Sequence, residues 1–286
     1  GPPPVNRLRG LWARFRARRV AVVGLVVVVL LAVAALGAPL FAPADPLAQP
    51  DPVALQNQPP SPEHPLGTDR FSRDVMSRLL YGARVSLGIG AAAALLAAVI
   101  GAGVGVAAGL GSPLVDQLLM RGVDVALALP RVFLLLLVLA LWEGAPAGVV
   151  IVLLAVTGWF PTSRVVRALV LRLREAEFVH AARALGAGRW GLVRRHLLPH
   201  LAPAVIVAAT LDVGNIILLE SGLSYLGLGI RPPAPSWGNM ILEGKDQLFG
   251  TPWVAAAPGL ALLVTVVAFN LVGDGLQDAL DPRSEK

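Results

Sequence analysis

VAVVGLVVVVLLAVAALGAPLF, the stretch of residues 20–41, contains no charged residue and includes four consecutive valines. A helix needs about 20 mostly apolar residues to cross the hydrocarbon core of a bilayer. Arg18 and Arg19 stand immediately before the stretch. A cleaved signal peptide is the alternative, but its apolar region would be shorter. We therefore interpret 20–41 as a first membrane span.

The composition of the whole chain agrees with a membrane protein. Of its 286 residues, 56% are hydrophobic and only 15% are charged. Soluble domains carry about 25% charged residues. The excess apolar surface exceeds what a water-soluble core could bury, so lipid must cover part of it. The chain has no cysteine, which excludes disulfides, Cys-ligated zinc and iron–sulfur clusters.

Five more stretches have the length and composition of membrane spans. They are residues 85–109, 123–142, 146–166, 201–219 and 253–272. A few charged residues, among them Asp124, Arg131 and Asp212, fall within these stretches. We predict an all-α, polytopic membrane protein with six transmembrane helices.

The positive charges are distributed unevenly between the connecting segments. With the N-terminus inside, the inner segments are 1–19, 110–121, 164–200 and 276–286. The outer segments are then 42–84, 142–148 and 224–252. The inner segments hold 17 of the 24 Lys and Arg residues and the outer segments hold 6. Because cytoplasmic loops carry an excess of Lys and Arg, we expect both termini to be cytoplasmic tails that flank a six-helix domain at 20–275.

The outer loop 42–84 changes character along its length. Its first part is rich in proline and is expected to be extended and irregular. Residues 72–82 are predicted to form a short separate helix, with Ser72 as its cap and Asp74 in its first turn.

Three glycines recur at every fourth position of the second span: Gly101, Gly105 and Gly109. This spacing places them on one helix face, where a neighbouring backbone can approach closely. A nucleotide-binding glycine loop is the alternative, but it requires a strand and a soluble helix N-terminus around it. The membrane-apolar flanks favour helix packing.

The chain lacks the motifs of the common hydrolases. A phosphate-binding loop requires G-x-x-x-x-G-K-[ST], whereas the only lysines are Lys245 and Lys286 and neither stands in such a context. H-E-x-x-H and G-x-S-x-G are also absent. We therefore expect no catalytic residue, metal site or cofactor in this chain. If ATP drives the protein, another chain hydrolyses it.

Ionisable residues at membrane depth usually mark a pathway or a structural pair. Asp124 and Arg131 are seven residues apart, about two helical turns, and both kinds of role stay open for them. Asp212 and Asn215 are about one turn apart on the fifth span. These two residues are candidates to face a translocation path.

The inner segment 177–199, EFVHAARALGAGRWGLVRRHLLP, is basic and amphipathic. A helix is predicted over 173–185, with an apolar stripe of Phe178, Ala181, Ala182 and Leu185. Gly186 and Gly188 are expected to end it, and a second helix over 190–198 is expected to end at Pro199. Residue properties alone allow either an interfacial anchor on anionic lipid or a docking handle for a soluble partner.

The order of residues in this segment resembles the EAA loop of ABC importer permeases: His180-Ala181-Ala182, then Gly186, then Leu198-Pro199. The resemblance implies a pair of coupling helices that sit in a groove of the ATPase subunit. His180 stands where the family usually has Glu, and Glu177 is the candidate to replace that acid. The residues assigned to ATPase coupling on this basis are Glu177, His180, Ala181, Ala182, Leu185, Gly186, Leu198 and Pro199.

Further stretches narrow the resemblance. They are HPLGTD at 64–69, LSYLGLG at 223–229, PSWGN at 235–239 and GDGL at 273–276. Together they are similar to the second, C-type permease subunit of the dipeptide, oligopeptide and nickel importers. Ser72 departs from the glycine that is more usual in the family. The resemblance implies a type I ABC importer permease-like fold in a bacterial inner membrane.

The resemblance also implies partners. They are a second homologous permease, two ATPase subunits that bind ATP and Mg, an extracytoplasmic substrate-binding protein and membrane lipid, with no nucleic acid. Pro235, Trp237 and Asn239 in the outer loop 224–252 are the candidate docking residues for the binding protein. The expected cargo is a di- or oligopeptide, and nickel or another small solute is an alternative. A self-sufficient secondary transporter or channel is the rival from another class, although the sequence shows no internal repeat of the kind found in many secondary transporters.

Overall fold

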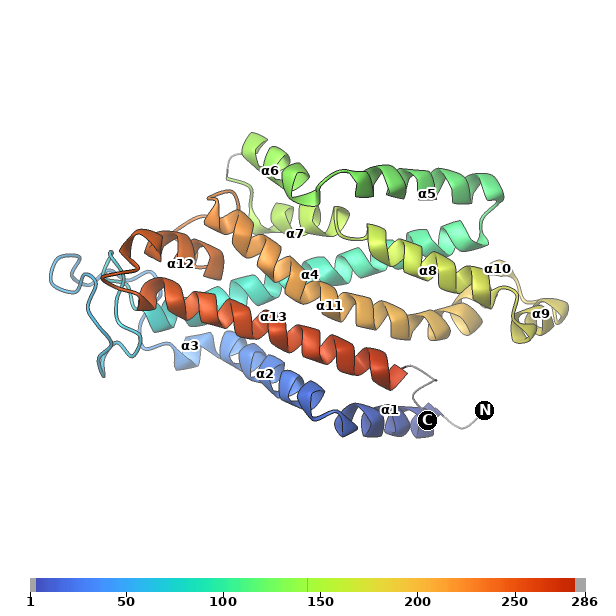
Figure 1. Cartoon of the computed structure of the whole chain (residues 1–286), viewed down its shortest axis with the longest axis horizontal. Coiled ribbons are helices and arrows are strands. Elements are labelled where there is room, and N and C mark those ends of the chain that lie inside the picture. Colours follow the sequence, from blue (N-terminus) through green and yellow to red (C-terminus); the bar gives the residue numbers. More distant parts are fainter. Residues whose placement is uncertain (1–3, 143, 281–286) are drawn as a thin grey trace.

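The structure is a computed structural model that describes residues 4–142 and 144–280. Within this part of the chain every regular element is a helix and none is a strand. The long helices lie side by side along the longest axis of the molecule (Figure 1). The prediction of an all-α membrane protein is therefore confirmed.

Four helical segments are long and apolar enough to cross a membrane. They are α2 (Arg19–Leu36), α4 (Val75–Leu110), Trp190–Tyr225 and α13 (Trp253–Leu280). The third of these combines most of α10 (Arg189–Leu192), a π-helical turn at Val193–Leu197 and α11 (Leu198–Tyr225). Pro199 does not end a helix as predicted but lies in the first turn of α11. Proline is tolerated there because a backbone N–H in the first turn would have no partner within the helix.

Two further spans are broken, which the sequence analysis did not predict. Helix α5 (Pro113–Ala128) meets α6 (Arg131–Leu141) at 81°, and α7 (Ala147–Val156) meets α8 (Phe160–Leu173) at 43°. The predicted continuous helices 123–142 and 146–166 are therefore wrong, although the count reaches six if each bent pair is one span. Proline causes the first break, since the residue before Pro130 is driven into an extended conformation.

The start of α4 also corrects a prediction. Residues 75–82 are the first turns of α4 and not a separate helix. Asp74 is the N-cap, and its carboxylate accepts a hydrogen bond of 2.6 Å from the Ser77 amide. Ser72 is not the cap; it stands in the loop before α4 with a φ of 60°.

Helix α4 lies at the centre of the bundle, in contact with α2, α7, α8 and α11. Its glycine face packs on α8, as the sequence predicted. A Cβ on Gly105 would lie 2.6 Å from the Ser163 carbonyl oxygen and 2.7 Å from Cβ of Val166. Gly101 and Gly109 meet Thr162 and Val170 of the same helix equally closely. The two helices can approach this far only because the face lacks side chains.

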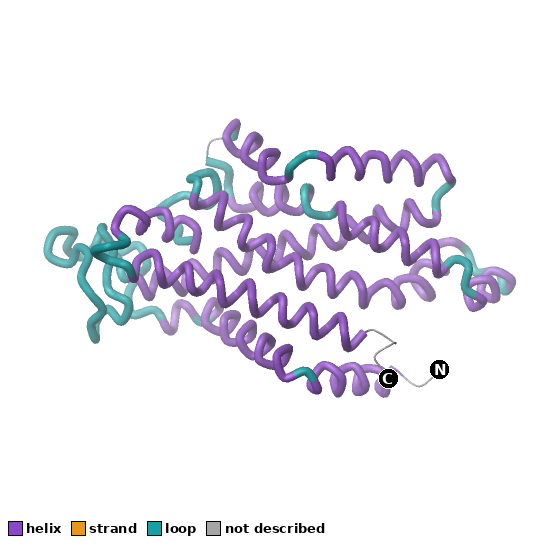
Figure 2. The backbone as a smooth tube through the Cα atoms, viewed as in Figure 1, coloured by secondary structure: helices purple, strands orange, loops and turns teal. Residues whose placement is uncertain are grey.

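The bundle has two distinct ends (Figures 1 and 2). Loop 42–74 and α12 (Trp237–Gly244) gather at one, which we call the α12 end. Helix α9 (Glu177–Ala184) projects from the other, which we call the α9 end. Helix α1 (Pro4–Ala17) and the last turns of α13 lie toward the α9 end, where Arg18 forms an ion pair with Asp278. The remaining short elements are α3 (Ala38–Phe41) and a 3₁₀ turn at Lys245–Gln247.

Candidate functional site

Residues 177–199 form a hairpin that we call the α9 hairpin. A Schellman motif ends α9 at the tip of this hairpin. The Ala187 amide donates to the Ala182 carbonyl at 3.0 Å, and the Gly186 amide donates to the Arg183 carbonyl at 2.9 Å. Gly186 has a φ of +84°, a left-handed conformation that glycine adopts without steric cost. The predicted break at Gly186 is therefore confirmed. The chain turns sharply here and returns toward the bundle through α10.

One face of the hairpin is anchored in the bundle. Val179 and Ala182 are buried in a cluster with Val166 and Val170 of α8 and Leu201 of α11. Of the predicted apolar stripe, only Ala182 is buried, and Val179 joins it in the core; Phe178, Ala181 and Leu185 are exposed. A helix of eight residues gains most of its stability from such packing, so this buried cluster holds α9 against the bundle.

The opposite face of the hairpin presents large apolar side chains to the exterior. Leu185 is 89% exposed and Trp190 is 73% exposed. Phe178 stacks on the ring of His200, with centroids 5.1 Å apart. Most of the residues assigned to coupling are exposed around this tip, and Ala182 is the buried exception. The exposed ones are Glu177, His180, Ala181, Leu185, Gly186, Leu198 and Pro199.

The expected helix 173–185 is interrupted. Helix α8 ends at Leu173 and α9 begins at Glu177, so the chain changes direction before the hairpin begins. Arg174 at this point donates to the Gly109 carbonyl at the end of α4, at 3.3 Å. The bond ties the base of the hairpin to the central helix.

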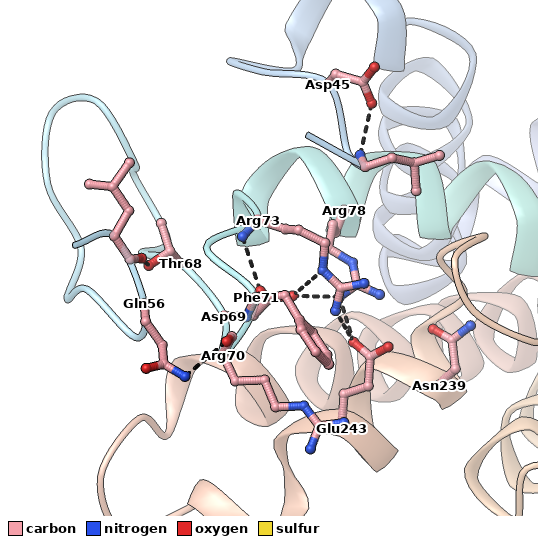
Figure 3. A network of polar contacts seen from close by, with 12 residues as sticks. Asp45, Gln56, Thr68, Asp69, Arg70, Phe71, Arg73, Arg78, Asn239 and Glu243 are labelled. Atoms are coloured by element: carbon pink, nitrogen blue, oxygen red, sulfur yellow. Dashed lines mark hydrogen bonds and ion pairs between the residues drawn. The ribbon is translucent and has the colours of Figure 1, made fainter. Parts of the chain in front are cut away.

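At the α12 end, four buried charges join the loop before α4 and the start of α4 to α12 (Figure 3). Glu243 accepts from Arg73 at 2.6 Å and from Arg78 at 2.5 Å. Asp69 accepts from Arg73 at 2.7 Å and from Arg78 at 2.6 Å. Two positive and two negative groups thus alternate around a ring. Such a network fixes one geometry, because each charge depends on its partners for compensation.

The candidate docking residues lie inside this end of the protein. Trp237 is 1% exposed, and its indole nitrogen donates to the Leu79 carbonyl at 3.2 Å. Asn239 completes a capping box with Ser236 and donates to the Ala234 carbonyl. Pro235 is buried as well. In this conformation the three side chains shape the loop from within, so other residues must supply any direct contact with a partner.

A surface pocket of about 580 Å³ opens beside the charge network. Phe71 lines it, with the guanidinium groups of Arg70 and Arg73 at 4.7 and 4.6 Å from the ring centroid. Pro232 and Lys245 line it as well. The pocket combines an aromatic ring with charges of both signs, which suits a polar protein surface better than lipid.

Arg131 occupies the junction of the two broken spans. Its Nη2 donates to the Leu154 carbonyl at 2.7 Å, and its Nε donates to the Thr157 hydroxyl at 3.2 Å. These groups lie at the end of α7, where carbonyl groups lack helical partners. A Cβ on Gly158 would lie 2.7 Å from Nη2. The absent side chain at Gly158 leaves the space that the guanidinium fills.

Asp124 does not pair with Arg131. It forms an ion pair with Arg164 of α8, and Asp116 forms a second one with Arg167. Arg131 instead bonds Leu154 and Thr157 at the end of α7. Asn215 lines a cavity of about 490 Å³ together with Arg131. Of the two candidate path residues, the structure thus places Asn215, but not Asp212, in the cavity beside the α5–α6 break.

A further acid, Glu220 of α11, is completely buried. It accepts from the Ser224 hydroxyl at 2.6 Å and from the Ser86 hydroxyl at 3.3 Å. The Trp237 amide donates to the same Ser86 oxygen. Glu220 therefore links α4 and α11 to the start of α12.

Comparison with known proteins identifies the family. Residues 100–286 match the family described as binding-protein-dependent transport system inner membrane component. This chain belongs to that family. Residues 6–60 of the permease also match the N-terminal transmembrane domain of oligopeptide transport permease C.

Relatives of the permease are similar along almost their whole length. A putative peptide permease protein of Brucella suis is 44% identical over 95% of this chain and 90% of its own. The dipeptide transport system permease protein DppC of Bacillus subtilis is 39% identical over 98% of this chain and 87% of its own. The oligopeptide transport system permease protein OppC of the same species is 38% identical over 96% and 88%.

A solved structure supports the fold. A chain from an inward-facing crystal form of the methionine ABC transporter MetNI superposes with a TM-score of 0.57 at 21% identity. The match covers 72% of the permease and 97% of that chain. The architecture is thus an ABC importer permease fold, as the sequence resemblance implied.

Sequence reasoning missed two parts of the permease's candidate site. The charge network joins residues about 170 positions apart, and no local pattern announces such pairing. The position of Arg131 was also missed, although the sequence held two signals: Pro130 directly before it and Gly158, which lies beside its guanidinium group. A proline next to an intramembrane arginine is a combination that can indicate a broken, functional span.

Proposed function

We propose that this permease is one of two pore-forming subunits of an ATP-driven, binding-protein-dependent importer of di- or oligopeptides. The printed names of the relatives support peptide as the cargo class. The α9 end faces the bacterial cytoplasm and the α12 end faces outward, in keeping with the distribution of Lys and Arg. Two ATPase subunits with ATP and Mg, and an external binding protein, complete the importer.

The α9 hairpin is the observation that carries the proposal. Its tip exposes Leu185 and Trp190, which are large and apolar, and α9 projects from this end of the bundle (Figure 1). Its inner face is packed on α8 and α11. A partner that holds the tip can therefore displace two spanning helices at once. This is the property required of a coupling element.

The mechanism that follows is alternating access. The ATPase pair closes on ATP and moves the hairpin, and the helices attached to it open the path toward the binding protein. ATP hydrolysis separates the pair and returns the path to the cytoplasm. A partner can switch the permease only if it binds the two states with different affinity, and the exposed tip is where that difference is delivered.

At the α12 end, the charge network holds loop 42–74 and the start of α4 against α12 as one platform. The binding protein docks on the exterior of this platform. Contact falls on exposed residues such as Arg70, Phe71 and Lys245 rather than on the buried Trp237.

The test is uptake of a labelled dipeptide into proteoliposomes that contain the permease with and without its partner subunits. Uptake should require the second permease, both ATPases, the binding protein and ATP. Because the chain has no native cysteine, a Leu185→Cys variant allows selective labelling of the tip. An impermeant thiol reagent should reach this cysteine only from the cytoplasmic side.

Two results would contradict the proposal. Uptake by the permease alone would place it with the secondary transporters. Labelling of the tip from the external side would reverse the topology and remove the hairpin from the reach of an ATPase.

A further inference from the structure

A cavity of about 440 Å³ lies where α1, α2 and α13 meet, toward the α9 end of the bundle (Figure 1). Every residue that lines it is aliphatic or aromatic, and Trp12, Leu25 and Leu276 represent the three helices. A buried water needs several polar partners, which this lining does not supply. The cavity therefore suits a hydrocarbon chain better than water.

Packing on α13 fixes the position of α1 beside this cavity. Phe15 is buried, and a Cβ on Gly275 would lie 3.0 Å from Cε2 of its ring. The ring thus uses the space that the missing side chain of Gly275 leaves. Trp12 stacks on Phe15 with the ring centroids 5.9 Å apart, and it is half exposed. The cavity is therefore bounded by side chains that the fold holds in place.

The length of α2 places the cavity near a membrane surface. Its 18 residues span about 27 Å, which is close to the thickness of roughly 30 Å of the hydrocarbon core. Its first residue, Arg19, therefore lies at the level of the lipid headgroups, where tryptophans such as Trp12 are also enriched. Val23, Val26 and Val29 are exposed along α2, as expected of a helix that contacts lipid.

Positive charge is concentrated at the same level. Residues 1–44 contain six arginines and no acid, and four of these arginines lie around the junction of α1 with α2. Arg18 pairs with Asp278. Arg16 and Arg19 are exposed and form no ion pair with any residue that the structure describes. Clusters of basic residues immediately next to a membrane span attract anionic lipid.

We propose that this cavity binds one anionic phospholipid. An acyl chain occupies the cavity between α1, α2 and α13, and the arginines at the junction of α1 with α2 bind the headgroup phosphate. Volume favours a lipid over a helix from a partner protein, because a helix at least 10 Å across would fill 440 Å³ with only about one turn. A single amphipathic anion satisfies both the apolar lining and the positive charge. Such a site is independent of the cargo that the permease carries.

Titration of the delipidated importer tests the charged part of the site. Phosphatidylglycerol or phosphatidylcholine is added, and bound lipid is counted by native mass spectrometry. Phosphatidylglycerol should bind more tightly. Arg16→Gln combined with Arg19→Gln should raise its dissociation constant about 25-fold, at about fivefold for each arginine. The matched control is Arg194→Gln with Arg195→Gln, which removes two exposed arginines at the same end of the bundle and should leave the dissociation constant unchanged.

A second pair of variants tests the apolar part. Leu25→Trp fills the cavity and should abolish this binding of phosphatidylglycerol. Leu30→Trp makes the same change at a residue of α2 that is exposed and lies outside the cavity, so binding should persist. Glycerol phosphate, which carries the phosphate without acyl chains, should not compete. If Leu25→Trp fails to assemble, the exposed arginine pair still decides the question.

Four outcomes would overturn the inference. They are equal affinity for the two lipids, an unchanged dissociation constant in the arginine double variant, equal binding by Leu25→Trp and Leu30→Trp, and competition by glycerol phosphate. Binding by the isolated permease but not by the assembled importer would show that another subunit covers the cavity, and it would also overturn the inference. None of these results depends on peptide uptake, so failure of the proposed function remains distinguishable.

Discussion

The charge network at the α12 end gives a prediction whose magnitude follows from its geometry. In the Glu243→Gln variant the side chain keeps its shape but loses its negative charge. Arg73 and Arg78 then share Asp69 as their only carboxylate within the network. The network passes from a balanced set of four charges to a buried excess of one positive charge.

The size of the effect follows from burial. All four side chains are less than 10% exposed, so water cannot replace the lost partner. Removal of one member of a buried ion pair costs about 3–5 kcal/mol. At about 1.4 kcal/mol per factor of ten, local opening of α12 should become roughly a hundredfold to several thousandfold more frequent.

Amide hydrogen exchange of residues 237–244 in the purified importer measures this opening. Lys245→Gln is the matched control, because it removes the charge of an exposed side chain two residues after Glu243. The control should leave exchange of α12 unchanged. Adding Arg73→Met to Glu243→Gln restores the balance between Arg78 and Asp69. This double variant should exchange more slowly than Glu243→Gln alone, by about tenfold or more, given the strong coupling expected of buried charges.

Two results would refute this reasoning. If Glu243→Gln changes exchange of α12 by less than about threefold, well under the cost of an uncompensated buried charge, the network does not hold the platform. The free-energy cost of opening α12 in the double variant can also equal the sum of the costs in Glu243→Gln and Arg73→Met. In that case the charges act independently and their balance does not determine the stability of α12.

The remaining predictions concern the other parts of the permease. Gly186→Val forces a branched residue into a left-handed conformation, at a cost of about 1–2 kcal/mol. This variant should reduce peptide-stimulated ATP hydrolysis while the permease still inserts into the membrane. Gly188→Val is the control, and equal ATPase rates of the two variants would contradict the coupling role. Gly105→Leu inserts a side chain where even Cβ would meet Ser163 at 2.6 Å, so the melting temperature of the detergent-purified permease should fall. Gly103→Leu, which faces open space, should melt like the parent, and equal melting of both variants would contradict the packing argument.

Local signals carried most of what the sequence could predict. Apolar length located the spans, four-residue glycine spacing identified the face of α4 that packs on α8, and Gly186 marked the end of α9. Each of these features depends on residues within a few helical turns of one another. For that reason a single sequence is enough to read them.

Features that depend on distant residues were missed or misplaced. Trp237 was expected at the surface, as a candidate docking residue for the binding protein. Its burial depends on Leu79 and Ser86 of α4, more than 150 positions away. The breaks at Pro130 and near Gly158 were also missed, because span prediction scores apolar content and does not test whether a helix is continuous.

Helix α8 connects the two proposed functional regions of the permease. Its 14 residues correspond to a rigid rod of about 21 Å. One end follows the break at Thr157 and Gly158, where Arg131 is bound, and the other leads into α9. The glycine face of α4 holds α8 at close range along this length, so α8 can slide or rotate against α4 more readily than it can separate from it. A pull on the α9 tip must therefore reach the acceptors of Arg131 as a shift of the whole helix. Helix α11 also continues from the hairpin, so a pull on the tip also acts on the residues of α11 that line the cavity beside Arg131. Under the proposed function, closure of the ATPases would in this way shift the groups that line this cavity, and a partner can drive that shift only if it binds the two arrangements with different affinity.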